Sequence, residues 1–289
     1  MKRFFLSLAI IAAATFTAFA QNTLTKEYNF GKITSIDAGS VYDIIATQGN
    51  SGKVKIVCDE YFKDGLIVKY YNGKLELGLE STKIKNKNNV EGIKVYLQMP
   101  TIEELDLSGA SSFKASGSFR TDELELDLSG ASSVEGLEIS GRELSMDCSG
   151  ASSLSITGDF NTVEADISGA SNVTLNGNSS QLEGEFSGAS NVKVNGNHKQ
   201  TDVTCSGASN LTLTGKTDYL KSVTTGASNL KAQEYTALNG YAQVSGASNA
   251  KVRCTGDLKI MVGKASKLTY YGNPNIINLN ADNNIRKGD

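Results

Sequence analysis

Residues 164–177 read EADISGASNVTLNG, residues 183–196 read EGEFSGASNVKVNG, and residues 202–215 read DVTCSGASNLTLTG. The letters SGAS are identical in all three segments, whereas the flanking letters keep only an alternation of apolar and polar types. Starts of the motif are spaced by 21, 20, 19, 19, 19, 19, 20 and 18 residues. They fall at Ser108, Ser129, Ser149, Ser168, Ser187, Ser206, Thr225 (as TGAS), Ser245 and, in the degenerate form GKAS, Gly263. A period near 20 residues is typical of a solenoid, so we expect nine coils between about residues 101 and 272.

Each repeat contains two stretches of period-two alternation, one on either side of SGAS. Examples are Leu124-Glu125-Leu126-Asp127-Leu128 before the motif and Val173-Thr174-Leu175 after it. Such alternation predicts half-buried β-strands, two per coil. We expect the strands to meet at SGAS and to return through Gly-Asn turns such as Gly196-Asn197. The predicted fold class is therefore all-β, a single-stranded parallel β-helix.

Stacking of the coils turns each repeat position into a column. We expect two apolar columns inside, one from Leu107 to Val262 just before the motif and one from Phe113 to Leu268 just after it. The motif alanines are small, as a core-facing residue at a sharp corner should be, and the motif serines should bond bent backbone groups. The motif glycines give the corner backbone angles that are closed to other residues; they are Gly109, Gly130, Gly150, Gly169, Gly188, Gly207, Gly226 and Gly246.

Carboxylates dominate the outward positions of the strand that precedes the motif. We predict two neighbouring columns on one sheet face, containing Glu104, Glu125, Glu164, Glu183 and Asp202 in one and Asp106, Asp127, Asp147, Asp166 and Glu185 in the other. Carboxylates about 5 Å apart repel by roughly 0.8 kcal/mol per pair even in water. Two interpretations stay open: a solvated face that keeps the solenoid soluble, or an interaction face for a cationic surface or for Ca²⁺.

Composition and charge restrict the class of protein. The run FFLSLAIIAAATFTAFA follows Lys2 and Arg3 and ends in Ala18-Phe19-Ala20, which predicts a signal peptide over residues 1–20 and export to the periplasm, the outer surface or the medium. Without Lys2 and Arg3, 26 basic residues face 31 acidic ones, which argues against a nucleic-acid partner. We expect no transmembrane segment after residue 20.

The remaining chemistry-bearing residues suggest structure rather than catalysis. The single histidine, His198, is predicted to be a solvated loop residue in a return turn, so no Ser-His-Asp arrangement is expected. Cys148 and Cys205 should lie three coils apart, beyond disulfide reach, and with Cys58 and Cys254 they are expected to be buried free thiols. An asparagine column just past the corner should hydrogen-bond along the axis; its members are Asn172, Asn191, Asn210, Asn229 and Asn249.

The flanking segments lack the motif. Residues 21–100 are rich in strand patterns and contain a predicted hairpin turn at Tyr71-Asn72-Gly73. Because a solenoid exposes a raw strand edge at each end, we interpret residues 21–100 as irregular early coils with a cap, continuous with the solenoid. Residues 273–289 are expected to close the other end.

Several stretches resemble the autotransporter adhesin, head GIN domain family of exported proteins from Gram-negative gut bacteria. They are FGKITSIDAGSVYDIIATQG near the start, VYLQMPTIEELDLSGASS at the entry to the repeats, the SGAS turns, and LTYYGNP near the end. The resemblance implies a right-handed, pectin-lyase-like β-helix and a role in cell adhesion without enzymatic residues. We therefore expect a non-enzymatic binding module that meets a surface, a glycan or a protein of a host or cell surface. The alternatives are a periplasmic or cell-surface structural protein without a dedicated ligand and, less favoured, a carbohydrate-active enzyme.

Overall fold

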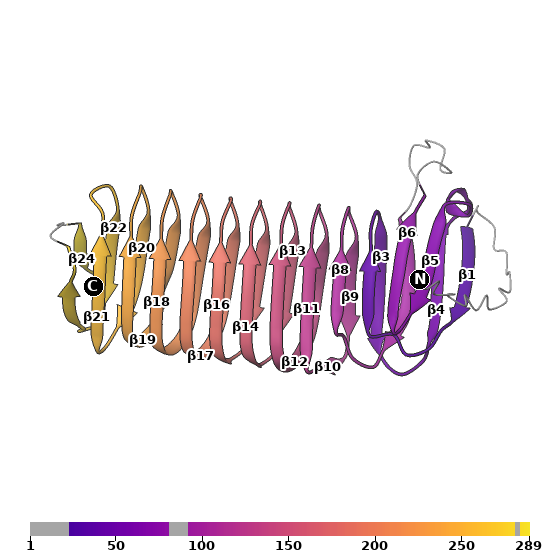
Figure 1. Cartoon of the computed structure of the whole chain (residues 1–289), viewed down its shortest axis with the longest axis horizontal. Helices are drawn as coiled ribbons and strands as arrows, with labels where there is room; N and C mark the ends of the chain where they lie inside the picture. The colour runs from indigo at the N-terminus through magenta and orange to yellow at the C-terminus, as the bar shows by residue number, and fades with distance from the viewer. Residues whose placement is uncertain (1–22, 81–91, 281–283) are drawn as a thin grey trace, which may run out of the picture.

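The computed structural model describes residues 23–80, 92–280 and 284–289, so the predicted signal peptide lies outside the described residues. The described residues form strands and one short 3-10 helix, arranged as a row of coils along one long axis (Figure 1). The elements are β1 (Thr23–Asn29), β2 (Ser35–Ala38), β3 (Tyr42–Gln48), β4 (Lys53–Asp59), η1 (Glu60–Phe62), β5 (Leu66–Tyr71), β6 (Lys74–Leu79), β7 (Ile93–Met99), β8 (Glu104–Leu107), β9 (Ser112–Ser116), β10 (Ser118–Arg120), β11 (Glu123–Leu128), β12 (Ser133–Cys148), β13 (Ser153–Thr157), β14 (Phe160–Ile167), β15 (Asn172–Asn176), β16 (Ser179–Phe186), β17 (Asn191–Cys205), β18 (Asn210–Thr224), β19 (Asn229–Val244), β20 (Asn249–Cys254), β21 (Asp257–Val262), β22 (Lys267–Tyr271), β23 (Asn275–Asn278) and β24 (Ile285–Lys287).

Two sheet faces enclose the core, and the long strands β12, β17, β18 and β19 bend from one face into the other. Sheet 1 runs in the order β5-β6-β2-β8-β11-β12-β14-β16-β17-β18-β19-β21-β23. Sheet 2 runs in the order β1-β4-β7-β3-β9-β12-β13-β15-β17-β18-β19-β20-β22-β24. All repeat strands pair in parallel, which confirms the β-helical fold class.

Registers of one coil on the next place like residues in columns. Leu128 pairs with Cys148, Cys148 with Ile167, and Ile167 with Phe186, and all four are buried. The second interior column, from Phe113 to Leu268, is buried as well. The repeat therefore acts as one coil, and its two apolar columns form a continuous core.

At each SGAS corner the glycine has a left-handed backbone, with φ between 65° and 72° at the eight motif positions. The motif alanine N–H donates to the glycine carbonyl of the preceding coil, at 2.7 Å for Ala131 to Gly109 and for Ala170 to Gly150. Backbones thus touch from coil to coil. A Cβ on Gly169 would lie 2.3 Å from the Gly150 carbonyl oxygen.

The expected direction of the corner alanine was wrong. Ala131 and Ala170 are exposed, whereas Ser132 and Ser171 are buried. Several serine hydroxyls bond the bent backbone, as expected: Ser132 Oγ donates to the Ser129 carbonyl at 2.8 Å, and Ser209 and Ser248 also donate to carbonyls. Ser152 and Ser171 bond each other instead, and Ser190 Oγ has no partner among the described residues. A buried hydroxyl needs an acceptor, and at most corners a backbone carbonyl supplies it where the serine turns inward and the alanine outward.

The lead-in contains full coils that lack the motif. Strands β2 and β3 stack directly on β8 and β9, in the register Ala38 to Leu107 and Asp43 to Ser112. Ser40, with φ of 99°, occupies the place of the corner glycine, and its backbone carbonyl accepts a hydrogen bond from the Ala110 N–H at 2.6 Å. One further coil, β6 with β7, stacks on β2 and β3 although it follows them in sequence.

The N-terminal end closes with antiparallel strands and aromatic rings. Strand β5 pairs antiparallel with β6 through the predicted hairpin, where Asn72 and Gly73 have φ of 49° and 86°. The rings of Tyr28, Phe30 and Tyr70 stack in sequence, with centroids 5.5 and 5.1 Å apart. These rings pack against the core where the regular coils end. They cover part of the apolar surface that would otherwise be left bare.

On the return side, two strands are separated at Gly177-Asn178, between β15 and β16, but the Gly-Asn turn predicted at Gly196-Asn197 is absent. Strand β17 runs without interruption from Asn191 to Cys205, bending at Gly196 rather than turning back in a loop. His198 therefore lies in a strand, opposite Ser179 and Thr217, and is only 4% exposed. The prediction of a solvated loop histidine was wrong, because continued strand pairing directs this side chain into the interior.

All four cysteines are buried and unpaired. Cys148 and Cys205 occupy one column three steps apart, through Ile167 and Phe186. Burial raises the pKa of the Cys148 and Cys205 thiols to about 12. Because the thiolate is the reactive species, these side chains act as small apolar residues.

Candidate functional site

The acidic columns predicted from the repeat lie side by side on the outer surface of sheet 1. Register pairs connect Asp106 to Asp127, Asp127 to Asp147, Asp147 to Asp166 and Asp166 to Glu185. The neighbouring column is paired from Glu104 to Glu125 and from Glu164 through Glu183 to Asp202, with Ser145 between its two halves. We call this surface the acidic stripe; it comprises Glu104, Asp106, Glu125, Asp127, Asp147, Glu164, Asp166, Glu183, Glu185 and Asp202.

The stripe extends into the lead-in, which the sequence pattern did not predict. Asp37 on β2 pairs with Asp106, and Glu76 on β6 pairs with Asp37. A signal was present in the letters SIDAG, which match the alternation and the small corner residues of the later coils. Without the intact motif, however, their register could not be assigned.

Lysine side chains flank one column of the stripe, from Glu104 to Asp202, at both ends. Lys74 Nζ lies 2.6 Å from Glu104 Oε1, and Lys221 Nζ lies 2.6 Å from Asp202 Oδ2. No other ion pair within the described residues involves a carboxylate of the stripe. Eight of its ten carboxylates thus have no cationic partner in this part of the chain.

Mutual repulsion adds to burial at the centre of the stripe. Partial burial, together with the charges of Asp127 and Asp166, raises the pKa of Asp147. Partial burial together with Asp37 and Asp127 raises the pKa of Asp106. Both shifts mean that ionising Asp106 and Asp147 costs more than ionising an isolated aspartate, so a positive charge docked beside them would be stabilising.

The carboxylates are arranged as parallel rows rather than as a ligand cage. A shallow hollow lies between Asp147, Glu164, Asp166, Glu183 and Glu185. Among the described residues, no three Asp, Glu, His or Cys side chains converge as a metal ion would require. The carboxylates of the stripe therefore form rows of like charge rather than a converging set of ligands.

Sheet 2 carries uncharged ladders where sheet 1 carries the stripe. Asn191 Nδ2 donates to Asn172 Oδ1 at 3.4 Å, and the chain of bonds continues to Asn210, Asn229 and Asn249 at 3.1–3.3 Å. Asn195 adds a second ladder, donating to Asn176 at 2.8 Å. These contacts follow the solenoid axis, which gives the asparagine column the structural role expected from the sequence.

The histidine lies in a small polar cluster inside the solenoid. His198 Nδ1 lies 2.7 Å from Ser179 Oγ, while Nε2 has no hydrogen-bond partner among the described residues. Burial lowers the pKa of His198 to about 4. Within the part of the chain that the structure covers, no carboxylate hydrogen-bonds or pairs with this ring, so Ser179 and His198 do not form a Ser-His-Asp arrangement.

No helix among the described residues has the length and apolar character needed to cross a bilayer.

The fold matches several solved structures at low sequence identity. A putative adhesin from Parabacteroides distasonis ATCC 8503 aligns with a TM-score of 0.57 and 14% identity, over 93% of this chain and 97% of that one. A putative adhesin from Parabacteroides merdae ATCC 43184 aligns with a TM-score of 0.54 and 15% identity, over 93% and 98%. A third protein, described as a putative lipid binding protein from P. distasonis ATCC 8503, aligns with a TM-score of 0.55 and 16% identity, over 93% of this chain and 98% of that one.

None of the curated proteins matches the chain. A family model described as "Putative auto-transporter adhesin, head GIN domain" matches residues 32–177 and 166–274. Together these matches span the solenoid and most of its lead-in, which is well over half of the chain. The chain belongs to the auto-transporter adhesin, head GIN domain family.

Proposed function

We propose that this protein is an exported, non-enzymatic adhesion module that binds a surface, glycan or protein partner through its flat sheet faces. Membership of an adhesin family and the likeness to adhesin folds support this class of function. The observation that carries the proposal is the acidic stripe, in which Asp106, Asp127, Asp147, Asp166 and Glu185 follow one another without a cationic partner among the described residues.

A partner with regularly spaced positive charges would relieve the repulsion within the stripe. Each coil advances about 4.8 Å, so basic groups along an extended polypeptide or a cationic cell surface can meet several carboxylates at once. Ca²⁺ could screen the same charges, but the parallel rows lack the converging oxygen ligands that it favours. We therefore favour a cationic macromolecular surface over a bound ion.

The first prediction concerns binding to a cationic probe. Immobilised polylysine should bind the purified protein, and a variant with Asp127→Lys, Asp147→Lys and Asp166→Lys should bind at least about tenfold more weakly, a loss of about 1.4 kcal/mol. Binding should weaken as salt increases, because the contacts are exposed. Biolayer interferometry at two ionic strengths measures both effects.

A matched control carries the same change in net charge away from the stripe. Asp64, Asp218 and Glu234 are exposed and outside the stripe, and their replacement by lysine should weaken binding far less. Equal losses in the two variants would show that only net charge matters and would contradict a binding role for the stripe. A wild-type protein that binds neither polylysine nor epithelial cells and mucin would instead favour the structural alternative.

A further inference from the structure

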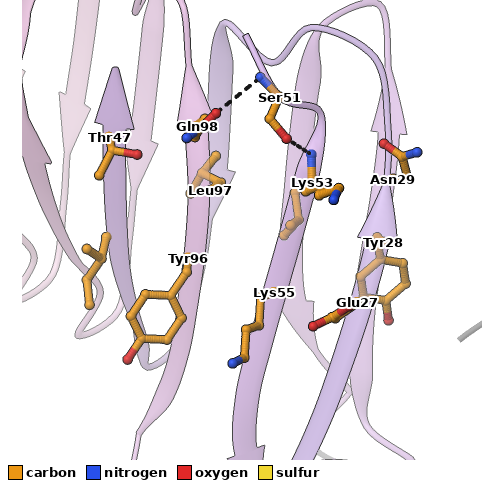
Figure 2. A pocket seen from close by; sticks show the side chains of 12 residues that line it. Glu27, Tyr28, Asn29, Thr47, Ser51, Lys53, Lys55, Tyr96, Leu97 and Gln98 are labelled. Carbon is orange, nitrogen blue, oxygen red and sulfur yellow. Dashed lines mark hydrogen bonds between the residues drawn. The ribbon is translucent and has the colours of Figure 1, made fainter. Parts of the chain in front are cut away.

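A second surface, opposite in charge, lies at the N-terminal end of sheet 2. The outward side chains of β1, β4, β7 and β3 line a hollow of about 550 Å³ (Figure 2). In the strand register Glu27 lies opposite Lys55, Lys55 opposite Tyr96, and Tyr96 opposite Ile45, so the four side chains form one row across the sheet. The hollow lies where the parallel coils give way to antiparallel strands.

Tyr96 is the aromatic centre of this hollow. Its side chain is 39% exposed, in contrast to the largely polar outer surface of the later coils of sheet 2. Ile45, half-buried beside it, extends the apolar surface. A flat ring exposed beside polar groups offers a platform on which the C–H face of a sugar ring can pack.

Polar groups border the platform on its other sides (Figure 2). Lys53 and Lys55 are exposed, and neither ammonium forms an ion pair within the described residues, whereas Glu27 is the only carboxylate in the lining. Gln98 is fixed on this rim, because its Oε1 accepts the Ser51 N–H at 3.3 Å, which leaves the amide NH₂ free to donate. The hollow thus combines a net positive charge with a fixed amide donor.

We propose that this hollow binds an acidic sugar, a pyranose bearing a carboxylate or a sulfate, at the end of a surface glycan. The sugar ring packs on Tyr96, its anionic group meets Lys53 or Lys55, and its hydroxyls bond Gln98 and Asn29. A simple anion would have no use for the exposed ring, and a neutral sugar would leave both lysines unused. The assignment rests on the proposed adhesion function and gives it a ligand class.

Binding by the hollow and by the stripe can be tested independently, because the two surfaces lie on different sheets and carry opposite charge. The probes are sialyllactose, sulfated lactose and neutral lactose, measured by saturation-transfer NMR and by titration against the purified full chain. Both acidic sugars should bind, with lactose at least about tenfold weaker, and the ratio between the two acidic sugars tells carboxylate from sulfate recognition.

Variants assign the contacts. Tyr96→Ala should lose at least about tenfold in affinity for both acidic sugars, whereas Tyr96→Phe should retain binding because the ring remains. The double variant Lys53→Ala and Lys55→Ala should bind the acidic sugars no more tightly than it binds lactose. Tyr219 is also 39% exposed but lies outside the hollow, so Tyr219→Ala is the matched control and should bind like the wild type.

The outcomes separate this proposal from the function on which it rests. Equal affinity for lactose and the acidic sugars, or unchanged binding by Tyr96→Ala, overturns the assignment of the hollow. If no sugar binds while polylysine still does, the hollow proposal fails and adhesion through the stripe stands. Sugar binding that survives charge reversal of the stripe but not Tyr96→Ala supports the proposal.

Discussion

Gly169→Ala is expected to lower the free energy of unfolding by about 2–5 kcal/mol. A left-handed backbone costs an alanine about 1–2 kcal/mol, and overpacking against a fixed neighbour typically adds 1–3 kcal/mol. Gly169 has φ of 65°, and its new Cβ would lie 2.3 Å from the Gly150 carbonyl oxygen and 2.8 Å from the Gly150 nitrogen. The atoms in contact are backbone, held by the coil-to-coil hydrogen bonds, so they cannot move aside easily. Urea unfolding followed by circular dichroism measures the loss.

Gly136→Ala is the matched control for this substitution. Gly136 has nearly the same φ, 64°, but a Cβ there would meet nothing within 4 Å. Its replacement should cost only the conformational term, about 1–2 kcal/mol. Similar losses at both positions would mean that the SGAS glycine is needed only for its backbone angle and that the corners do not pack backbone on backbone.

His198 is expected to make the folded protein less stable as the pH falls from 6.5 to 4. Burial holds the pKa of His198 at about 4 in the folded state, below its ordinary value of 6.5. The unfolded chain therefore takes up the proton first, and the stability that this residue contributes is present above pH 6.5 and lost as the pH falls to about 4. The full effect is about 3 kcal/mol.

A threonine variant isolates this contribution. Thr217 occupies the position of His198 in the next coil, so His198→Thr inserts a side chain that the same column already accepts. The carboxylates of the stripe with raised pKa values, such as Asp147, act in the opposite direction, losing stability as the pH rises, but they are common to both proteins. The unfolding free energy of the wild type minus that of the variant should increase as the pH rises from 4 to 6.5. A difference that is independent of pH would contradict the buried, neutral histidine.

The repeated part of the fold could be predicted because its period is written in the letters. Once SGAS defines the length of a coil, the interior places of Leu128 and Ile167 and the outward places of Asp127 and Asp166 follow from strand alternation alone. The acidic stripe was therefore available from the sequence.

Features that depend on departures from the repeat were not predictable. In the lead-in, Ser40 replaces the corner glycine and Tyr42 the corner serine, and the coil stacks on one that begins 69 residues later. The hollow around Tyr96 depends on a strand order of the same kind. Strand β7 pairs with both β3 and β4 and lies between them in the sheet, although it follows both in the sequence.

The sequence also did not determine which of the small corner residues, the motif alanine or the motif serine, faces the core. Alanine and serine are of similar size, and only the position of the backbone carbonyls decides which of Ala131 and Ser132 faces inward. His198 was misplaced for a related reason: the sequence indicates a glycine on the return side, but not whether the strand bends or turns there.

Distances along one column test the central claim, that each repeat is one coil stacked in register on the next. Spin labels would be placed on Asn249→Cys together with Asn172→Cys, Ser112→Cys or Asp43→Cys, which lie four, seven and eight coils away. The native thiols are buried and should take no label, which the wild-type protein checks. At about 4.8 Å per coil, double electron–electron resonance should give backbone separations of about 19, 34 and 38 Å. Distances that do not increase in these steps, above all an Asp43 label no farther away than the Ser112 label, would contradict the stacked solenoid and the surfaces built on it.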